Sequence, residues 1–173
     1  PQTLGLVKNS SVLDNVMIGG LSRLSSLNSF FKIFPKQELE YAHKVLKLVG
    51  LDEKSSRKVH MLSGGEKRRV AIARALMQKP DILLADEIVS ELDAVTAREI
   101  MDVIRDAQKK FKLTAIMIHH DMNLALEYAN RVAVIKDGDK VLEIGVDGEQ
   151  IIDFQTGDLT QEEIMEMYNE PKK

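Results

Sequence analysis

The pattern of apolar and polar residues predicts several helices in the first two thirds of the chain. Apolar side chains recur at helical spacing in three long segments. These segments are Gln37 to Val49, Ser63 to Met77 and Ala94 to Phe111. A shorter helix is expected to start after Ser11, because Asp14 completes a capping pattern, and to end at Gly19-Gly20. Leu21 to Pro35 shows no clear period and is interpreted as an irregular insertion.

Two short runs predict strands: the wholly apolar Ile82 to Ala85 and the largely apolar Leu113 to Ile118. Strands of a parallel sheet that are covered on both faces show such runs in place of alternation. Together with the helix between them, the two runs predict a βαβ unit with a right-handed crossover.

The C-terminal part predicts a hairpin and two more helices. Val132 to Ile135 and Val141 to Ile144 alternate about Asp137-Gly138, which is typical of a hairpin. A short helix is expected around Leu124 to Tyr128, and a last one from Thr160 to Tyr168. From Glu143 to Glu170 there are nine acidic residues and no Lys or Arg. We interpret this stretch as a solvated acidic edge, with an interaction surface as the alternative.

Composition narrows the class of protein only slightly. The chain has 173 residues, 44% hydrophobic and 29% charged, as in an ordinary soluble domain or a domain with a small subdomain. The net charge of −3 gives nucleic acid no electrostatic attraction, so no nucleic-acid partner is expected. The absence of cysteine excludes disulfides and thiolate metal sites. No apolar stretch is long enough to cross a bilayer and no signal peptide is evident, so any membrane crossing requires another polypeptide.

Asp86 and Glu87 come directly after the apolar run Ile82 to Ala85. Ligands of open α/β sheets gather at the carboxyl ends of strands, where a carboxylate can hold a phosphate-bound Mg²⁺. A second carboxylate beside it can orient or deprotonate an attacking water. By itself this pattern is weak, because many strands simply emerge into solvent at charged residues.

Ser63-Gly64-Gly65 lies about twenty residues before Asp86, at the predicted start of a helix. Ser63 can cap this helix, and glycines remove the Cβ atoms that would keep a polyphosphate from the backbone amides. Free N–H groups and the helix dipole then favour a terminal phosphate. An ordinary glycine turn is the alternative, but it does not explain the residues that continue from Lys67 to Leu76.

Leu62 to Leu76, LSGGEKRRVAIARAL, resembles the signature motif of ABC ATPases, and the match is highly specific. Asp86 and Glu87 stand where that family has its Walker B magnesium ligand and its catalytic glutamate. The segment from Ser90 to Asp93 is similar to the D-loop, and the one from Ile118 to Asp121 to the switch-histidine segment. Gln2 resembles the Q-loop glutamine. The resemblance runs from Gln2 to about Gly145 in the family's order and spacing.

This resemblance implies ATP hydrolysis to ADP and phosphate, with ATP and Mg²⁺ as cofactors. Asp86 and Gln2 would hold Mg²⁺, Glu87 would activate water, and His120 would contact the γ-phosphate. Members of the family pair head to tail, so a second ABC ATPase domain is the expected partner. Nucleotide binding across that dimer is implied for Ser63, Gly64, Gly65, Glu66 and Asp93. Gln2 would also link the site to a membrane subunit.

The histidines and the basic run have competing interpretations. Neighbouring residues that leave a strand point to opposite sides, and the family pattern places its histidine just before Asp121, which selects His120 over His119. A metal-binding histidine pair is disfavoured, since no third ligand is evident. His43 and His60 are interpreted as surface residues. Lys67 to Arg69 spread around a helix and do not form a nucleic-acid stripe; solvation or contact with neighbouring carboxylates is expected.

A phosphate-binding P-loop requires G-x-x-x-x-G-K-[ST], and the 173 residues contain no such motif. In the resembling family this loop, its strand and an adenine-stacking aromatic precede the Q-loop. We therefore expect that these residues alone do not hydrolyse ATP at an ordinary rate. Ile88-Val89 and Glu91 also depart from the family pattern, which puts the local geometry near Asp93 in doubt.

The expected fold is α/β: a P-loop NTPase-like parallel sheet with flanking helices, incomplete at the N-terminus, plus an ABC-type helical subdomain. Predicted segments are a Q-loop segment over 1–10, the helical subdomain over 11–78, the Walker B, D-loop and switch-histidine part over 79–145, and an acidic extension with a helix over 146–173.

The resemblance implies an ATP-binding subunit that powers transport through separate permease subunits, peripheral on the cytoplasmic face of the membrane and served by a substrate-binding protein. The Gly19 to Pro35 insertion, Val89 and the ending from Leu159 to Tyr168 are similar to phosphonate importers. The alternatives are a soluble ABC ATPase of DNA repair or translation and a noncatalytic regulatory fragment. Only about sixty residues separate Gln2 from the signature, which leaves no room for the long coiled coil of repair proteins.

Overall fold

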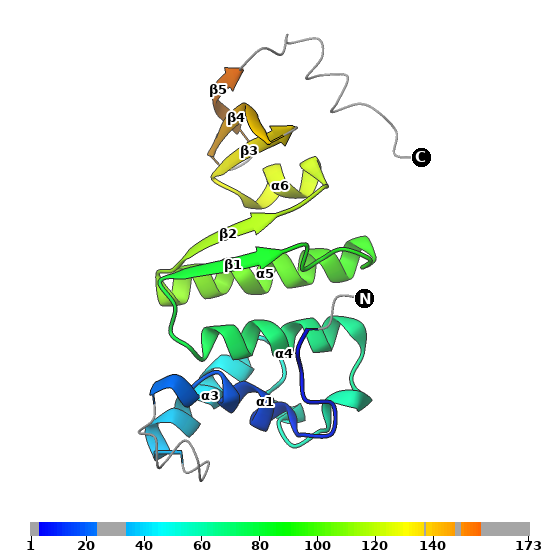
Figure 1. Ribbon diagram of the computed structural model, residues 1–173, viewed down its shortest axis with the longest axis vertical. Coiled ribbons are helices and arrows are strands. Elements are labelled where there is room, and N and C mark those ends of the chain that lie inside the picture. Colours follow the sequence, from blue (N-terminus) through cyan, green and yellow to red (C-terminus); the bar gives the residue numbers. More distant parts are fainter. Residues whose placement is uncertain (1–3, 24–33, 137, 148–149, 157–173) are drawn as a thin grey trace. The chain divides into compact units, whose positions relative to one another are not determined.

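The computed structural model describes residues 4–23, 34–136, 138–147 and 150–156. The chain divides into two compact units, Pro1–Ile118 and His119–Lys173 (Figure 1). The first unit contains α1 (Val12–Ile18), α3 (Lys36–Leu48), α4 (Gly64–Leu76), β1 (Ile82–Asp86), α5 (Ala94–Phe111) and β2 (Thr114–Ile118), with short 3₁₀ turns η1 (Leu21–Arg23), η2 (Asp52–Lys54) and η3 (Val59–Met61). The second contains α6 (Met122–Tyr128), β3 (Arg131–Lys136), β4 (Asp139–Asp147) and β5 (Gln150–Thr156).

Helices α1, α3 and α4 share an apolar core, and each predicted helix in this part of the chain is confirmed. Ser11 caps α1 and Asp14 returns the hydrogen bond, so the predicted capping box is present. Gly50 follows α3 with φ +68°, a conformation that favours glycine. The core consists of fully buried side chains from the three helices: Val12, Val16, Ala42, Val45, Leu46, Val70, Ala73 and Leu76.

The segment that follows Gln2 is held by polar groups of two helices. Asn15 of α1 is fully buried; its Oδ1 accepts a hydrogen bond from the Val7 amide at 2.8 Å, and its Nδ2 donates to the Val7 carbonyl at 3.1 Å. Arg74 of α4 donates to the carbonyls of Leu4 and Gly5 at 2.8 and 2.7 Å. A buried amide with its partners satisfied adds rigidity, so residues 4–7 have a defined path along α1 and α4.

Strands β1 and β2 pair in parallel, with Asp86 opposite Ile118 at their carboxyl ends. Helix α5 connects them, as the βαβ pattern predicts, and buries Ile100, Met101, Ile104 and Ala107. The expectation that β1 is covered on both faces is wrong for the described residues. Leu83 and Ala85 are buried, whereas Leu84 is 74% exposed. The physical reason is that the helices cover one face, and no described element covers the other.

The second unit is a helix followed by an antiparallel sheet of order β3-β4-β5. The predicted hairpin is confirmed, with Gly138 at φ +92° in its turn. Its core brings Leu142, Ile144 and Val146 against Leu126, Val132 and Val134. Strand β5 was not predicted, because the acidic composition of this stretch suggested a solvated edge. The helix predicted from Thr160 to Tyr168 lies outside the described residues.

The predicted subdivision at residues 11, 79 and 146 stays a prediction, as does the irregular Leu21 to Pro35 insertion beyond η1, because 24–33 are not described. Among the described residues, no helix combines the length and the apolarity that crossing a bilayer requires.

Close packing of α1 on α4 makes Gly19 a sensitive position. A Cβ atom at Gly19 would lie 2.1 Å from the carbonyl oxygen of Arg74, a backbone atom that cannot move aside. We expect Gly19→Ala to lower the free energy of unfolding by about 3 kcal/mol, at the upper end for overpacking. Urea unfolding measures this. Gly64→Ala is the control, since a Cβ there meets nothing within 4 Å. Equal stability of the two variants would contradict the close approach.

Candidate functional site

Asp86 and Glu87 lie at the carboxyl end of β1, as the sequence predicts. Glu87 has φ +46°, a left-handed conformation that is uncommon outside glycine and costs on the order of 1 kcal/mol. Its amide donates to the carbonyl of Ile118 at 3.2 Å, which fixes the residue against the end of β2. A glutamate held in a strained turn at a strand end has the placement expected of a reactive carboxylate.

The turn after Glu87 is fastened by Ser90 and by a residue of α4. The amide and the hydroxyl of Ser90 both donate to the Glu87 carbonyl, at 3.0 and 2.8 Å. Arg68 Nη2 in turn donates to the carbonyl of Ser90. Val89 is buried, and Glu91 has φ +62°. The two departures from the family pattern therefore occupy a well-defined turn.

Asp93 is the N-cap of α5. Its Oδ1 accepts hydrogen bonds from the amides of Val95 and Thr96 at 3.1 and 2.9 Å. The hydrogen bonds from the Thr96 hydroxyl and the Thr96 amide lower the pKa of this carboxyl. Asp93 is thus ionised at neutral pH and is oriented by the helix that it caps.

The start of α4 has the geometry of an anion site. Ser63 Oγ accepts from the Glu66 amide at 3.2 Å, and Glu66 Oε2 accepts from the Ser63 amide at 2.8 Å, forming a complete capping box. The amides of Gly64 and Gly65 precede the first intrahelical bonds and have no acceptor among the described residues. Free donors at the positive end of a helix dipole attract anions.

The two glycines of this motif have different surroundings. A Cβ at Gly64 would meet nothing within 4 Å, so the exposed side of the first turn is open. A Cβ at Gly65 would lie 2.8 Å from Thr96 Cγ2, so this glycine lets α4 approach α5. Access to the amides therefore depends on Gly64, whereas the packing of α4 on α5 explains why residue 65 is glycine.

Glu66 is paired with Lys54 of η2 as well as with the Ser63 amide. The hydrogen bonds from Lys54 and from the Ser63 amide hold the pKa of Glu66 below its usual value. The carboxylate is therefore charged at neutral pH, and its described contacts are within the chain. Its expected contact with nucleotide stays a prediction.

His119 and His120 open the second unit. The Asp121 amide donates to His119 Nδ1 at 2.7 Å, so the ring of His119 is turned back toward its own backbone and carries its proton on Nε2. Asp121 Oδ1 accepts from the Leu124 amide and caps α6. His120 is exposed. The choice of His120 over His119 stays a prediction.

The carboxylate of Asp86 suits a magnesium ion that is held mostly by other oxygens. It is exposed and makes no hydrogen bond or ion pair with the described part of the chain. No group of three His, Cys, Asp or Glu side chains that could hold a metal occurs among the described residues. Mg²⁺ commonly takes one or two carboxylates and completes its shell with phosphate and water. Gln2, the other expected ligand, lies outside the described residues.

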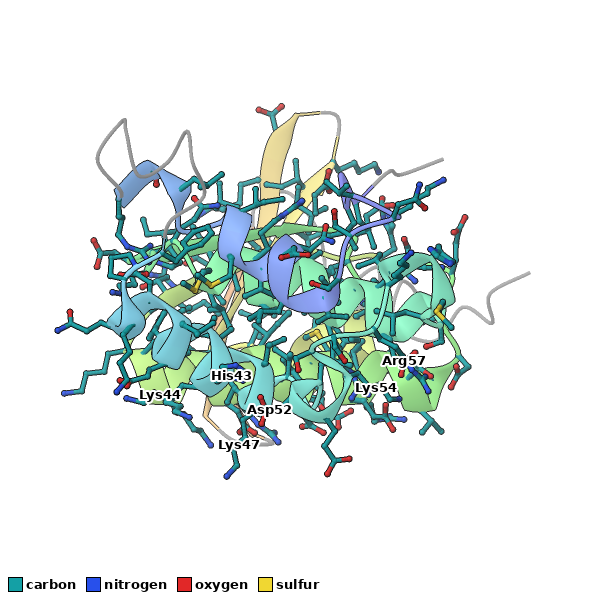
Figure 2. All side chains as sticks on the ribbon, turned by 90° about the horizontal axis from the view of Figure 1, so that it is seen from below. His43, Lys44, Lys47, Asp52, Lys54 and Arg57 are labelled. Carbon is teal, nitrogen blue, oxygen red and sulfur yellow. The ribbon has the colours of Figure 1, made fainter. Side chains whose placement is uncertain are left out.

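Sequence reasoning missed Lys54, Arg68 and Thr96, each of which contacts, from another element, a site residue or the turn that follows Glu87. A hydrogen bond between distant elements leaves no periodic signal in the sequence. In the basic run, Arg69 pairs with the carboxylate of Glu99, as expected, whereas Arg68 donates to a backbone carbonyl. His43 is half-exposed and bonds to Asp52 at 2.8 Å on the outer side of α3 (Figure 2).

The sequence of this chain is similar to those of known proteins. A family model described as "ABC transporter" matches residues 1–90. The chain is 38% identical over 170 residues to the phosphonates import ATP-binding protein PhnC of Shouchella clausii, covering 98% of this chain and 60% of that protein. It is 45% identical over 140 residues to PhnC of Bdellovibrio bacteriovorus, covering 81% of this chain and 54% of that protein. The chain thus spans less than two thirds of the length of these relatives.

A solved structure is similar in fold to most of this chain. The dimeric ATP-binding cassette MJ0796, in a post-hydrolysis state bound to ADP and Pi, matches with a TM-score of 0.68 and 29% identity. The match covers 86% of this chain and 62% of that structure. The expected fold class, a P-loop NTPase-like parallel sheet with an ABC-type helical subdomain, agrees with this neighbour.

The contact between Gly65 and Thr96 can be tested by a compensating pair. Gly65→Ala is expected to lower the free energy of unfolding by about 2 kcal/mol, through overpacking at the Thr96 methyl. Thr96→Ser removes that methyl and keeps the hydroxyl, so the double variant should recover most of the loss. Urea unfolding of the four proteins measures the coupling. Strictly additive effects would show that the two residues do not meet.

Proposed function

This chain belongs to the ABC transporter family, and we propose that it is part of a subunit that hydrolyses ATP to drive import through separate membrane subunits. The observation that carries the proposal is the arrangement of two parts within one compact unit. One is a helix start with open amides at Gly64, and the other is the Asp86-Glu87 pair at the end of a parallel strand. ATP hydrolysis needs both a phosphate-binding surface and a base for water.

Glu87 is the proposed general base. Its amide is bonded to the Ile118 carbonyl, and its carbonyl accepts hydrogen bonds from Ser90. The turn that carries its carboxylate is therefore held in one conformation. A positioned carboxylate can accept a proton from the attacking water. His120 is proposed to contact the γ-phosphate, with the neighbouring His119 turned away toward Asp121.

Asp86 is proposed to hold Mg²⁺ together with Gln2. When bound, Mg²⁺ supplies positive charge to the phosphate oxygens and neutralises the charge that develops there. The free carboxylate of Asp86 is suited to this because no described residue competes for it. Asn15 and Arg74 fix the path of residues 4–7.

The signature residues are proposed to bind the nucleotide of a second ABC ATPase domain. The open first turn of α4 supports this, because Gly64 has no packing reason to be glycine. Ser63, Gly65, Glu66 and Asp93 complete the proposed nucleotide contacts across the dimer. The similar cassette MJ0796 is dimeric, which supports pairing with a second ATPase domain here.

Transport is favoured over a role in DNA repair or translation, because the relatives reported above are import proteins by name. We therefore propose a phosphonate as the transported substrate. The subunit would act on the cytoplasmic face of the membrane, beside permease subunits and with a substrate-binding protein that delivers the phosphonate.

Glu87→Gln in the full-length protein tests the proposed base. The amide keeps the shape of the side chain but cannot accept the proton, so ATP hydrolysis should fall at least about a hundredfold. ATP should still bind, and ATP-bound dimers should accumulate because the nucleotide persists. Phosphate release and gel filtration with Mg-ATP measure the two effects. Normal turnover would move the role elsewhere, with His120 the first candidate.

Gly64→Asp tests the role of the signature across the dimer. An aspartate in the first turn suits the helix dipole, so the variant should fold and bind ATP as a monomer. In the dimer its carboxylate would face the partner's γ-phosphate, and like charges this close cost several kcal/mol at about ε 20. We expect neither ATP-driven dimerisation nor hydrolysis.

The control for Gly64→Asp is Gly64→Ala, which adds a Cβ without a charge. Mixing Gly64→Asp with a subunit that carries a defective P-loop lysine gives a second comparison. One of the two hybrid sites would then be intact, so partial activity is expected. A mixture that forms heterodimers without any activity would argue against independent composite sites.

A further inference from the structure

We propose that Lys54 is a positioning residue of the signature site, which neutralises Glu66 so that a phosphate can approach the amides at the start of α4. This inference rests on the proposed function and adds to it a residue outside the signature motif. Lys54 Nζ and Glu66 Oε1 form an ion pair that joins η2 to the first turn of α4.

Glu66 places a negative charge beside the proposed anion site. Its carboxylate folds back to the Ser63 amide at 2.8 Å, so the charge lies over the same turn that presents the free amides of Gly64 and Gly65. The carboxylate is useful to the helix, because it completes the capping box and opposes the dipole. For an incoming phosphate it is a like charge at short range, and the dimer interface would remove much of the screening water.

Lys54 offsets the repulsion between Glu66 and an incoming phosphate, because its backbone position brings its ammonium to the Glu66 carboxylate. It ends η2, whose neighbour Leu51 is buried and whose following residue, Ser55, accepts a backbone hydrogen bond from Leu13 at 2.9 Å. The Lys54 backbone is therefore fixed to the helical core, and its side chain reaches Glu66 with 41% of its surface exposed. The ammonium balances the carboxylate while its free side adds positive potential at the site.

Other lysines of the same region lack this relation to the site. Lys47 projects from the outer side of α3, and Figure 2 shows it apart from Lys54. The side chain of Lys47 makes no hydrogen bond or ion pair with the described residues. Lys47→Ala thus removes an equal charge from the same subdomain without touching Glu66, and it serves as the matched control.

The experiment measures ATP-driven dimerisation of the full-length protein in Glu87→Gln background, by analytical ultracentrifugation over subunit concentration. Lys54→Ala should raise the dissociation constant at least about tenfold, from like-charge repulsion at the interface. Adding Glu66→Gln to Lys54→Ala should restore it to within about threefold, because glutamine has no charge but keeps both the capping box and a hydrogen-bonding group for the proposed nucleotide contact. Lys47→Ala should leave the constant unchanged.

The rescue separates electrostatic positioning from support of the fold. Added salt should narrow the gap between Lys54→Ala and the parent, since it screens the unpaired carboxylate. If Lys54 only stabilised the helix start, the double variant would be no better than Lys54→Ala, and melting temperature would fall with dimerisation. An unchanged constant in Lys54→Ala would also overturn the proposal. Failure of the parent and of Lys47→Ala to dimerise would instead reject the proposed function, and this inference with it.

Discussion

The close approach of α4 to its neighbours is the constraint on which the rest of the first unit depends. At one end, Gly19 lets α1 contact the Arg74 carbonyl region; at the other, Gly65 lets α4 meet Thr96 of α5. Between these ends the polar side chains of α4 reach outward to three other segments. Arg68 holds the turn after Glu87, Arg69 pairs with α5, and Arg74 holds residues 4 and 5. A small shift of α4 would thus displace every part of the proposed site in this unit.

The same helix joins two proposed roles that belong to different nucleotides. Its first turn is proposed to face the partner's phosphate, while Arg68, one turn further on, fastens the turn that carries the subunit's own Glu87. The strain of the left-handed backbone at Glu87 is offset by hydrogen bonds at both its amide and its carbonyl. Rigidity at this point favours catalysis, because a base must be placed before the reaction begins.

Electrostatics at the start of α4 shows a compromise between folding and binding. The best N3 residue for the helix is an acid, and Glu66 fills that need with a complete capping box. An anion site at the same turn needs the opposite charge, and Lys54 supplies it from another element. The lowered pKa of Glu66 reflects the same contacts, with the Lys54 hydrogen bond as the main cause.

The sequence by itself determined the local elements and supplied the candidate site residues. Periodicity placed α3, α4 and α5 nearly to the residue, because an amphipathic helix repeats its pattern every turn. The capping residues Ser11 and Ser63 and the hairpin at Gly138 were readable because each acts within a few neighbouring positions. Asp86 and Glu87 were found because a strand end is marked by a change from apolar to charged residues.

Tertiary structure alone decided which residues support that site and which faces are covered. Lys54, Arg68 and Thr96 contact it across twelve or more positions of sequence or from separate elements, and such contacts follow from packing, which no local pattern encodes. The side chains of β1 from Ile82 to Ala85 are apolar on both faces of the strand. Of these, only Leu83 and Ala85 are buried by described residues. Strand β5 formed in an acidic stretch because β4 offered it backbone partners. Burial and strand pairing depend on the elements that lie next to a segment in space, and the sequence of that segment alone does not specify those elements.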